Sequence, residues 1–351
     1  MQPLTHRAAR ALAMLEAQGR LAAALTEAGE ARLTDEVVAG MPTLVARPRR
    51  GSAWPGLIFV NGATRRGRHH PEVRRAARRL ASAGFLVLVP DPPGLTTGVL
   101  GDATVRALVD GVRVAVHLPE CRCGRVGLLG VSTGTSLALL AAEEATVADR
   151  ITVVAGLAPF ADLRGMVRLA TTGSYLRAGA LEPFPAGPFL TLVIARSLAV
   201  GLTGRDGGEV RGLLAAVQDG DPDPLAVLRS TDPARLCDDS RALRAVLLNR
   251  DPAVFDELYG ALPEPIQAGV ERLSPLTGIH RLQAPAELAT APLDKYFPRA
   301  ESEALAARSP MVRLTVSPAL GHYRPEISLS GARELARVNA FCVRVLHAAR
   351  G

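Results

Sequence analysis

Short apolar segments alternate with longer amphipathic ones over the first half of the chain. Residues 36–46 carry β-branched side chains around a glycine and predict an early antiparallel hairpin. Continuous apolar runs, typical of strands covered on both faces, span residues 56–60, 85–89, 125–131 and 151–157. Helical spacing predicts helices over residues 71–84, 103–117 and 133–144. This alternation predicts an α/β fold, with a mostly parallel sheet flanked by helices on both sides.

The alternation stops after residue 157 and resumes only near the C-terminus. Residues 163–274 show helical stretches and Pro/Gly/Asp breaks without a convincing strand. Strand patterns return at 284–289 and 312–316, before a last helix at 330–350. So long an interruption must fold as a unit of its own. We therefore expect three parts: an N-terminal helical segment, a core domain, and a helical cap subdomain inserted in the core. Their bounds are 1–34 for the segment, 35–162 with 275–351 for the core, and 163–274 for the cap.

Two apolar stretches bear on membranes and targeting. Residues 1–30 are rich in Ala and Leu but interrupted by charges, which predicts an amphipathic helix and not a signal peptide. Residues 188–202 contain Arg196 and are shorter than the ~20 residues that a membrane span needs. A buried cap helix is the favoured interpretation, and contact with a membrane surface is the alternative.

Charge and cysteine content narrow the class further. The net charge is +7, but Lys295 is the one lysine among 41 basic residues, which indicates a base-composition bias in the coding sequence. Acidic residues are interleaved with the arginines, so we expect no nucleic-acid partner. The four cysteines have neither CxxC nor metal-ligand spacing and predict reduced thiols in a cytoplasmic protein. The oligomeric state stays open.

A serine lies between an apolar strand and an Ala/Leu-rich helix. The segment Gly130-Val131-Ser132-Thr133-Gly134 fits the GxSxG pattern in the context that this motif requires. A serine on so sharp a turn presents its hydroxyl at the carboxyl end of the sheet, where α/β proteins bind ligands. The N–H of Thr133, at the start of the helix, is the expected first donor to an oxyanion.

The loop after the 56–60 strand offers a second donor. It reads Asn61-Gly62-Ala63-Thr64, and the N–H of Ala63 would complete an oxyanion hole. Gly62 allows close approach of the backbone to a substrate. We expect Asn61, Gly62 and Thr64 to line the substrate-binding site.

A serine nucleophile needs a base, most often histidine. Of the seven histidines, His322 follows the strand at 312–316 and precedes the last helix, so it would emerge at the same end of the sheet as Ser132. His69 and His70, in the loop near Ala63, are the rivals, although a solvated basic loop explains them well. Whether either contacts substrate stays open.

The base in turn needs an acid that orients its imidazole and stabilises its charged form. Asp294 follows the 284–289 strand, which gives the chain order Ser132, Asp294, His322. Asp162, after the 151–157 strand, is the competing carboxylate. We favour Asp294, because Asp162 is better placed to anchor the start of the cap.

Taken together, these landmarks resemble the α/β-hydrolase superfamily of esterase-like serine hydrolases over residues 36–350. They are NGA after a strand, the GVSTG elbow, DKYFP after a late strand, and GH before the last helix. Asn61 and Thr290 depart from residues common in the family. The resemblance implies acyl transfer on a small-molecule ester without metal or organic cofactor. The apolar cap, with Phe184, Phe189 and Leu190, favours a carboxylesterase. Alternatives are a thioesterase, a lipase-like enzyme, a peptidase, or a non-catalytic ligand-binding member of the fold.

Overall fold

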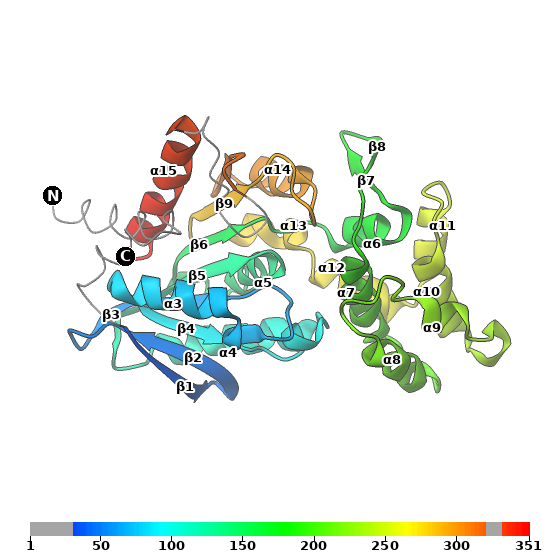
Figure 1. The fold of residues 1–351 in the computed structure, drawn as a ribbon, viewed down its shortest axis with the longest axis horizontal. Helices are drawn as coiled ribbons and strands as arrows, with labels where there is room; N and C mark the ends of the chain where they lie inside the picture. The colour runs from blue at the N-terminus through cyan, green and yellow to red at the C-terminus, as the bar shows by residue number, and fades with distance from the viewer. Residues whose placement is uncertain (1–30, 321–331) are drawn as a thin grey trace.

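Within residues 31–320 and 332–351, which the computed structural model describes, an eight-stranded sheet forms the centre of the molecule (Figure 1). The strand order is β1-β2-β4-β3-β5-β6-β9-β10, and β2 is the strand that runs antiparallel to its neighbours. The strands are β1 (Arg32–Val38), β2 (Met41–Arg47), β3 (Trp54–Val60), β4 (Leu86–Pro90), β5 (Cys121–Val131), β6 (Ile151–Leu157), β9 (Ala286–Thr290) and β10 (Val312–Val316). The parallel, helix-flanked sheet confirms the α/β prediction.

Helices cover both faces of this sheet because its strands alternate their apolar side chains between two cores. In β3, Leu57 and Phe59 pack with one core while Ile58 and Val60 pack with the other. The first core is covered by α3 and α15, and the second by α4, α5 and α14. Their bounds are α3 (Pro71–Ser82), α4 (Asp102–Ala115), α5 (Thr133–Ala142), α14 (Arg299–Arg308) and α15 (Ala332–Ala348).

The early hairpin is confirmed, and it corrects one boundary. Strands β1 and β2 join through Ala39 and Gly40, whose φ angles of 51° and 74° are those of the tight turn that matches strand twist. Because β1 begins at Arg32, residues 32–34 belong to the sheet and not to the N-terminal helical segment expected over 1–34. The rest of that prediction, residues 1–30, lies outside the described residues.

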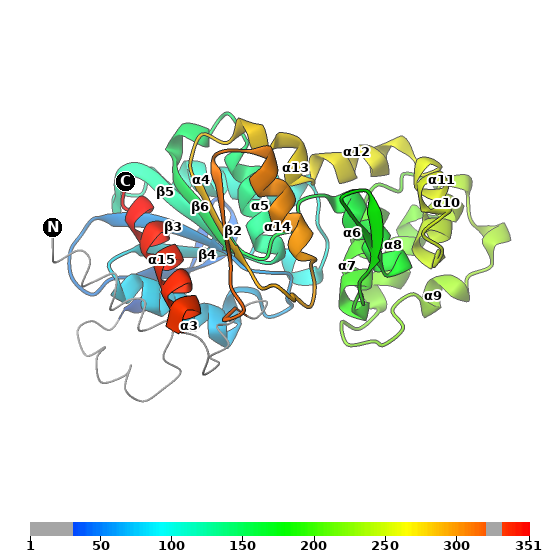
Figure 2. The same ribbon diagram turned by 90° about the horizontal axis from the view of Figure 1, so that it is seen from above.

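Residues 163–274 lie beyond one end of the sheet, to one side of the core in both views (Figures 1 and 2). Their helices are α6 (Leu163–Thr172), α7 (Pro188–Ala199), α8 (Gly207–Ala216), α9 (Ala226–Arg229), α10 (Asp238–Leu248), α11 (Phe255–Gly260) and α12 (Glu264–Arg272). The chain returns to the core through α13 (Pro275–Gly278). We call residues 163–274 the insertion.

The insertion departs from the expectation that it is helical throughout. Strands β7 (Ser174–Arg177) and β8 (Ala180–Pro183) form an antiparallel hairpin of their own. Its turn, Ala178-Gly179, has φ angles of 49° and 84°. The two strands are four residues long and mostly exposed, so they lack the apolar alternation by which strands are predicted from sequence.

The insertion meets the core at connections that follow the carboxyl ends of the strands. Two hydrogen bonds join the connection between β4 and α4 to α7. Nη1 of Arg196 donates to the Thr97 carbonyl at 3.0 Å. The Leu100 N–H donates to Oγ of Ser197 at 2.9 Å. The insertion therefore stands at the edge of the sheet where α/β proteins bind ligands.

Candidate active site

Ser132 occupies a strained turn between β5 and α5. Its φ and ψ are 54° and −130°, and a positive φ is unfavourable for a residue with a side chain. The turn is held on both sides, since the Ser132 N–H donates to the Leu157 carbonyl at 2.8 Å and the Ser132 carbonyl accepts from the Thr135 N–H at 2.8 Å. The backbone of this serine is therefore fixed by its neighbours, as a nucleophile elbow requires.

Close approach of main chains explains why glycine stands at position 134. A Cβ added there would lie 2.2 Å from the Val60 carbonyl oxygen and 2.4 Å from that of Asn61, which no adjustment of side chains can relieve. The first turn of α5 thus packs directly on the end of β3. The elbow and the loop that follows β3 are consequently held together by their backbones.

The predicted oxyanion loop lies beside Ser132. A Cβ added at Gly62 would be 3.5 Å from the Cβ of Ser132 and 3.4 Å from the Val131 carbonyl oxygen. The N–H of Ala63, the next residue, has no hydrogen-bond partner in the part of the chain that the structure describes. Thr133 is buried at the first position of α5, where helical N–H groups point forward without intrahelical acceptors. Two backbone donors therefore flank Ser132.

Internal hydrogen bonds give this loop a defined shape. Nδ2 of Asn61 donates to the Gly67 carbonyl at 3.3 Å, and the Gly67 N–H donates to the Thr64 carbonyl at 3.0 Å. The Arg68 N–H donates to Oδ1 of Asp91, just after β4, at 2.8 Å. The Asn61 amide is thus used within the loop, and contact of Asn61, Gly62 or Thr64 with a substrate stays a prediction.

Asp294 follows β9, two strands along the sheet from β5. Its side chain is buried, and Oδ1 accepts the N–H groups of Tyr296 at 2.9 Å and Phe297 at 3.0 Å. These contacts use one carboxylate oxygen to fix the side chain in its turn. Since β5, β6 and β9 are parallel, Ser132 and Asp294 follow strand ends at the same edge of the sheet.

The rival carboxylate, Asp162, is engaged differently. It is the N-cap of α6, and its oxygens accept the N–H groups of Arg164 and Gly165, each at 3.0 Å. Its Oδ1 also accepts the hydroxyl of Ser274 at 3.4 Å, at the point where the chain leaves the insertion. Asp162 therefore ties the entry of the insertion to its exit.

The predicted base, His322, lies outside the described residues. Its rivals are described: His70 caps α3 by accepting the Glu72 N–H on Nδ1 at 3.3 Å, and His69 is exposed in the preceding turn. The chain leaves β10 at the edge of the sheet where β9 also ends. There the Ser317 N–H donates to the Thr290 carbonyl at 3.1 Å, close to the turn that carries Asp294.

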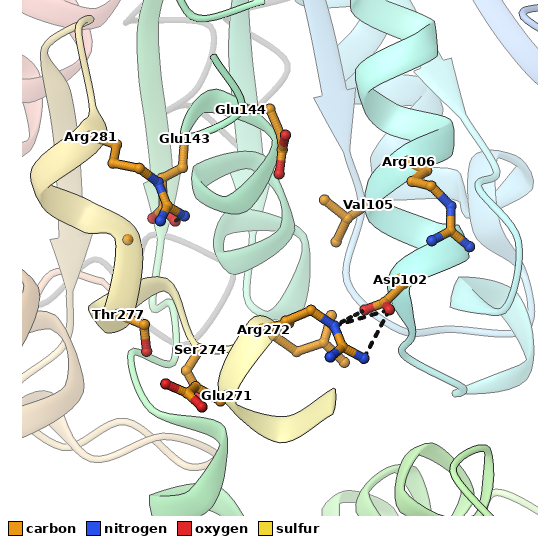
Figure 3. Close-up of a pocket in the computed structure, with 12 residues that line it drawn as sticks. Asp102, Val105, Arg106, Glu143, Glu144, Glu271, Arg272, Ser274, Thr277 and Arg281 are labelled. Atoms are coloured by element: carbon orange, nitrogen blue, oxygen red, sulfur yellow. Dashed lines mark hydrogen bonds and ion pairs between the residues drawn. The ribbon is translucent and has the colours of Figure 1, made fainter. Parts of the chain in front are cut away.

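A separate cavity of about 350 Å³ lies at the opposite end of α5 (Figure 3). Figure 3 shows Glu143 and Arg281 at one side of it and the ion pair of Arg272 with Asp102 across from them. Burial raises the pKa of Glu143 to about 8, against the opposing effect of Arg281, whose Nη2 is 3.3 Å from Oε2. Since α5 spans ten residues, ~15 Å of helix separates this cavity from Ser132.

Sequence patterns did not single out Glu143 or the cavity around it. Glu143 comes at the end of an Ala/Leu-rich helix, where a carboxylate is expected at the surface, yet its side chain is 1% exposed and its Oε1 has no hydrogen-bond partner among the described residues. The cover comes from α13, distant in sequence. Over the same residues, no group of three or more His, Cys, Asp or Glu side chains is arranged to hold a metal ion.

Sequence comparison identifies no relative: no protein-family model and no curated protein matches this chain. Structural comparison does. A truncated carbohydrate esterase from gut microbiota superimposes with a TM-score of 0.52 at 12% identity, over 91% of this chain and 98% of that one. Dipeptidyl peptidase 4 of Porphyromonas gingivalis gives 0.50 at 12% identity, over 92% of this chain and 36% of that one. Est1E of Butyrivibrio proteoclasticus gives 0.49 at 13% identity, over 91% and 98%.

At such identities the likeness concerns the fold alone. The order and direction of the strands, the turn at Ser132 and the neighbours with TM-scores of 0.50 and above agree on a single architecture. This chain has the α/β-hydrolase fold.

Proposed function

We propose that this protein is a serine hydrolase that cleaves an ester-type bond through an acyl-enzyme formed on Ser132. The observation that carries the proposal is the backbone at Ser132, which is held at a φ of 54° beside a loop whose Ala63 N–H has no partner in the described structure. Strained turns persist where surrounding structure over-determines them, and they cluster at active sites.

In the proposed mechanism Oγ of Ser132 attacks the substrate carbonyl carbon and its proton passes to His322. The carbonyl oxygen becomes an oxyanion that accepts the N–H groups of Ala63 and Thr133. Asp294 orients the imidazole and stabilises its charged form. As the tetrahedral intermediate collapses, His322 protonates the departing alcohol. Water, which gives a proton to His322, then attacks the acyl carbon; the bond to Oγ of Ser132 breaks, the acid leaves, and His322 returns the proton to Oγ. The residues supply every group in this sequence, so the mechanism uses no metal or organic cofactor.

The apolar side chains of the insertion favour a substrate with an apolar acyl or alkyl group. It stands at the edge of the sheet that carries Ser132, and α7 is buried almost throughout. Leu190 is buried, while Phe184 and Phe189 are partly buried against the same core. We therefore propose a carboxylesterase acting on small or apolar esters. Thioesterase, lipase-like or peptidase activity would use the same groups, and a ligand-binding protein of this fold is the non-catalytic alternative.

A location in the cytoplasm remains part of the proposal. None of the four cysteines, all of which lie in the described part of the chain, forms a disulfide, as expected in a reducing compartment. In the described part of the chain, none of the helices combines the length and the apolar character needed to cross the bilayer. Contact of the insertion with a membrane surface is the less favoured alternative.

Hydrolysis of p-nitrophenyl esters tests the function directly. A series of increasing acyl length, assayed with the wild type and Ser132→Ala, should give turnover that depends on Ser132 and identifies the preferred acyl chain. Turnover that survives Ser132→Ala would refute the assignment of the nucleophile. A folded wild type that binds these esters without turnover would favour the ligand-binding alternative.

A further inference from the structure

One carboxylate of the insertion joins it to the loop beside Ser132. Asp219, which follows α8, accepts two hydrogen bonds. Nε of Arg65 donates to its Oδ2 at 2.8 Å, and Nη1 of Arg196 donates to its Oδ1 at 3.0 Å. Arg65 comes two residues after Ala63, whose N–H is a donor in the proposed mechanism. Asp219 therefore bridges the proposed oxyanion loop and a helix of the insertion.

The far end of this bridge is rigid. Arg196 is the charged residue that interrupts the apolar sequence of α7, and its side chain is 4% exposed. Beyond Asp219, its guanidinium donates to the carbonyls of Leu214 at 3.1 Å, Val217 at 2.6 Å and Thr97 at 3.0 Å. So many bonds hold the guanidinium in one place, and through it they hold Asp219.

The near end is more open. The side chain of Arg65 is 53% exposed and that of Asp219 is 25% exposed. Burial alone would raise the pKa of Asp219, but hydrogen bonds from Arg65 and Arg196 outweigh it, so the pKa lies below its usual value and the group is ionised near neutral pH. An exposed ion pair contributes little to global stability. A contact of this kind has its effect locally, on the loop that it restrains.

We propose that Asp219 is a positioning residue: held by Arg196, it restrains Arg65 and thereby fixes the loop that carries Ala63 against Ser132. The inference rests on the function proposed above. It gives the insertion a part in catalysis, because a residue of the insertion holds the oxyanion loop in position. Misplacing an oxyanion donor weakens binding of the transition state more than binding of the substrate. Loss of the bridge is therefore expected to lower kcat while KM changes little.

The test compares variants at the bridge with a matched pair in the same segment. Arg65→Gln and Asp219→Asn each break the bridge, whereas Asp223→Asn breaks an exposed ion pair with Arg229, and both residues of that pair belong to the insertion. With a p-nitrophenyl ester, Arg65→Gln should lower kcat about five- to twentyfold with KM within about twofold. Arg65→Lys should recover part of the loss, and Asp223→Asn should match the wild type.

Two further measurements make the result decisive. The double variant Arg65→Gln/Asp219→Asn should lose less than the product of the two single losses, because both changes remove the Arg65–Asp219 pair. Amide hydrogen exchange over residues 61–67 should accelerate in Arg65→Gln and Asp219→Asn but not in Asp223→Asn. If Asp219→Asn fails to fold because the buried Arg196 loses its carboxylate partner, Arg65→Gln carries the test, since the side chain of Arg65 is half-exposed.

The outcomes separate this inference from the proposed function. An active wild type with unchanged kcat and unchanged exchange in Arg65→Gln would overturn the positioning role and leave the nucleophile intact. A wild type without turnover dependent on Ser132 would refute the proposed function and the positioning role together.

Discussion

The sheet core and the insertion are built on different principles. In the core, Ser132 is placed by the main chain: β5 and α5 meet at a fixed φ, and Gly134 lets α5 contact the end of β3. The insertion shares an apolar core with the helices over one face of the sheet, and polar side chains, chiefly Arg196 and Asp219, add hydrogen bonds to the connections that follow the strands. The reactive geometry should therefore depend on core residues, while residues of the insertion should modulate rate and substrate choice.

The largest effect is expected at the base. His322→Ala should lower kcat/KM by about 10⁴- to 10⁶-fold, since removing the base disables the nucleophile. His69→Ala is the control, because His69 is an exposed turn residue near the oxyanion loop, and it should retain activity within about twofold. Steady-state hydrolysis of a p-nitrophenyl ester measures both. A greater loss in His69→Ala than in His322→Ala would transfer the role of base.

Substitution of the two candidate acids compares a residue of the core with a residue at the start of the insertion. Asp294→Asn should lower kcat by about 10³- to 10⁴-fold because the imidazole loses its orienting carboxylate. Asp162→Asn should leave kcat within about tenfold and instead lower the midpoint of thermal unfolding, since Asp162 caps α6. The reverse pattern of kcat losses would show that the acid lies at the entry of the insertion.

Glycine substitutions separate the two regions by stability. Gly134→Ala would place a methyl group 2.2 Å from a β3 carbonyl oxygen and should cost about 3 kcal/mol of unfolding free energy. Gly212→Ala, in α8 of the insertion, meets no atom within 4 Å and should stabilise the protein by ~0.5 to 1 kcal/mol. Urea denaturation measures both. Equal stabilities would contradict the packing described for the elbow.

The smallest expected effect concerns Glu143, in the core but away from Ser132. Its pKa is raised from 4.5 to about 8 by burial, with Glu144 adding to the rise and Arg281 opposing it. The native state thus holds the proton more tightly than the unfolded state, so its stabilising effect is present below pH 4.5 and is lost as the pH rises through 8.

The test is to compare unfolding free energies of the wild type and Glu143→Gln from pH 5 to pH 9. Each unit of pKa corresponds to ~1.4 kcal/mol, so the wild type should lose a few kcal/mol more unfolding free energy than the variant as the pH rises. Kinetics of ester hydrolysis should be the same in both. Parallel stability curves would show that Glu143 is ionised throughout this range.

Sequence patterns predicted the core well because its strands and helices have clear hydrophobic periodicity. The runs at 56–60 and 151–157 became β3 and β6, and the elbow at Ser132 followed from the strand and helix on either side of it. Apolar strands and amphipathic helices have periods that survive whatever packs against them. The right-handedness of the connections limits the possible strand orders, but the order itself comes from the structure.

The insertion was predicted only in outline because its polar contacts with the core join residues that are distant in the sequence. Arg196 interrupts an apolar stretch of the sequence, but the neighbouring residues do not indicate that it pairs with Asp219 or that Arg65 binds the same carboxylate. The hairpin β7–β8 was missed because its strands are short and mostly exposed. Glu143 was missed because α13, which covers it, comes from a distant part of the sequence.

The role of Ser132 is tested by mapping the adduct of a fluorophosphonate probe on the full chain by peptide mass spectrometry. We expect one modified residue, Ser132, and no labelling in Ser132→Ala or in heat-denatured protein. An unlabelled but folded wild type, or an adduct on another side chain, would contradict it.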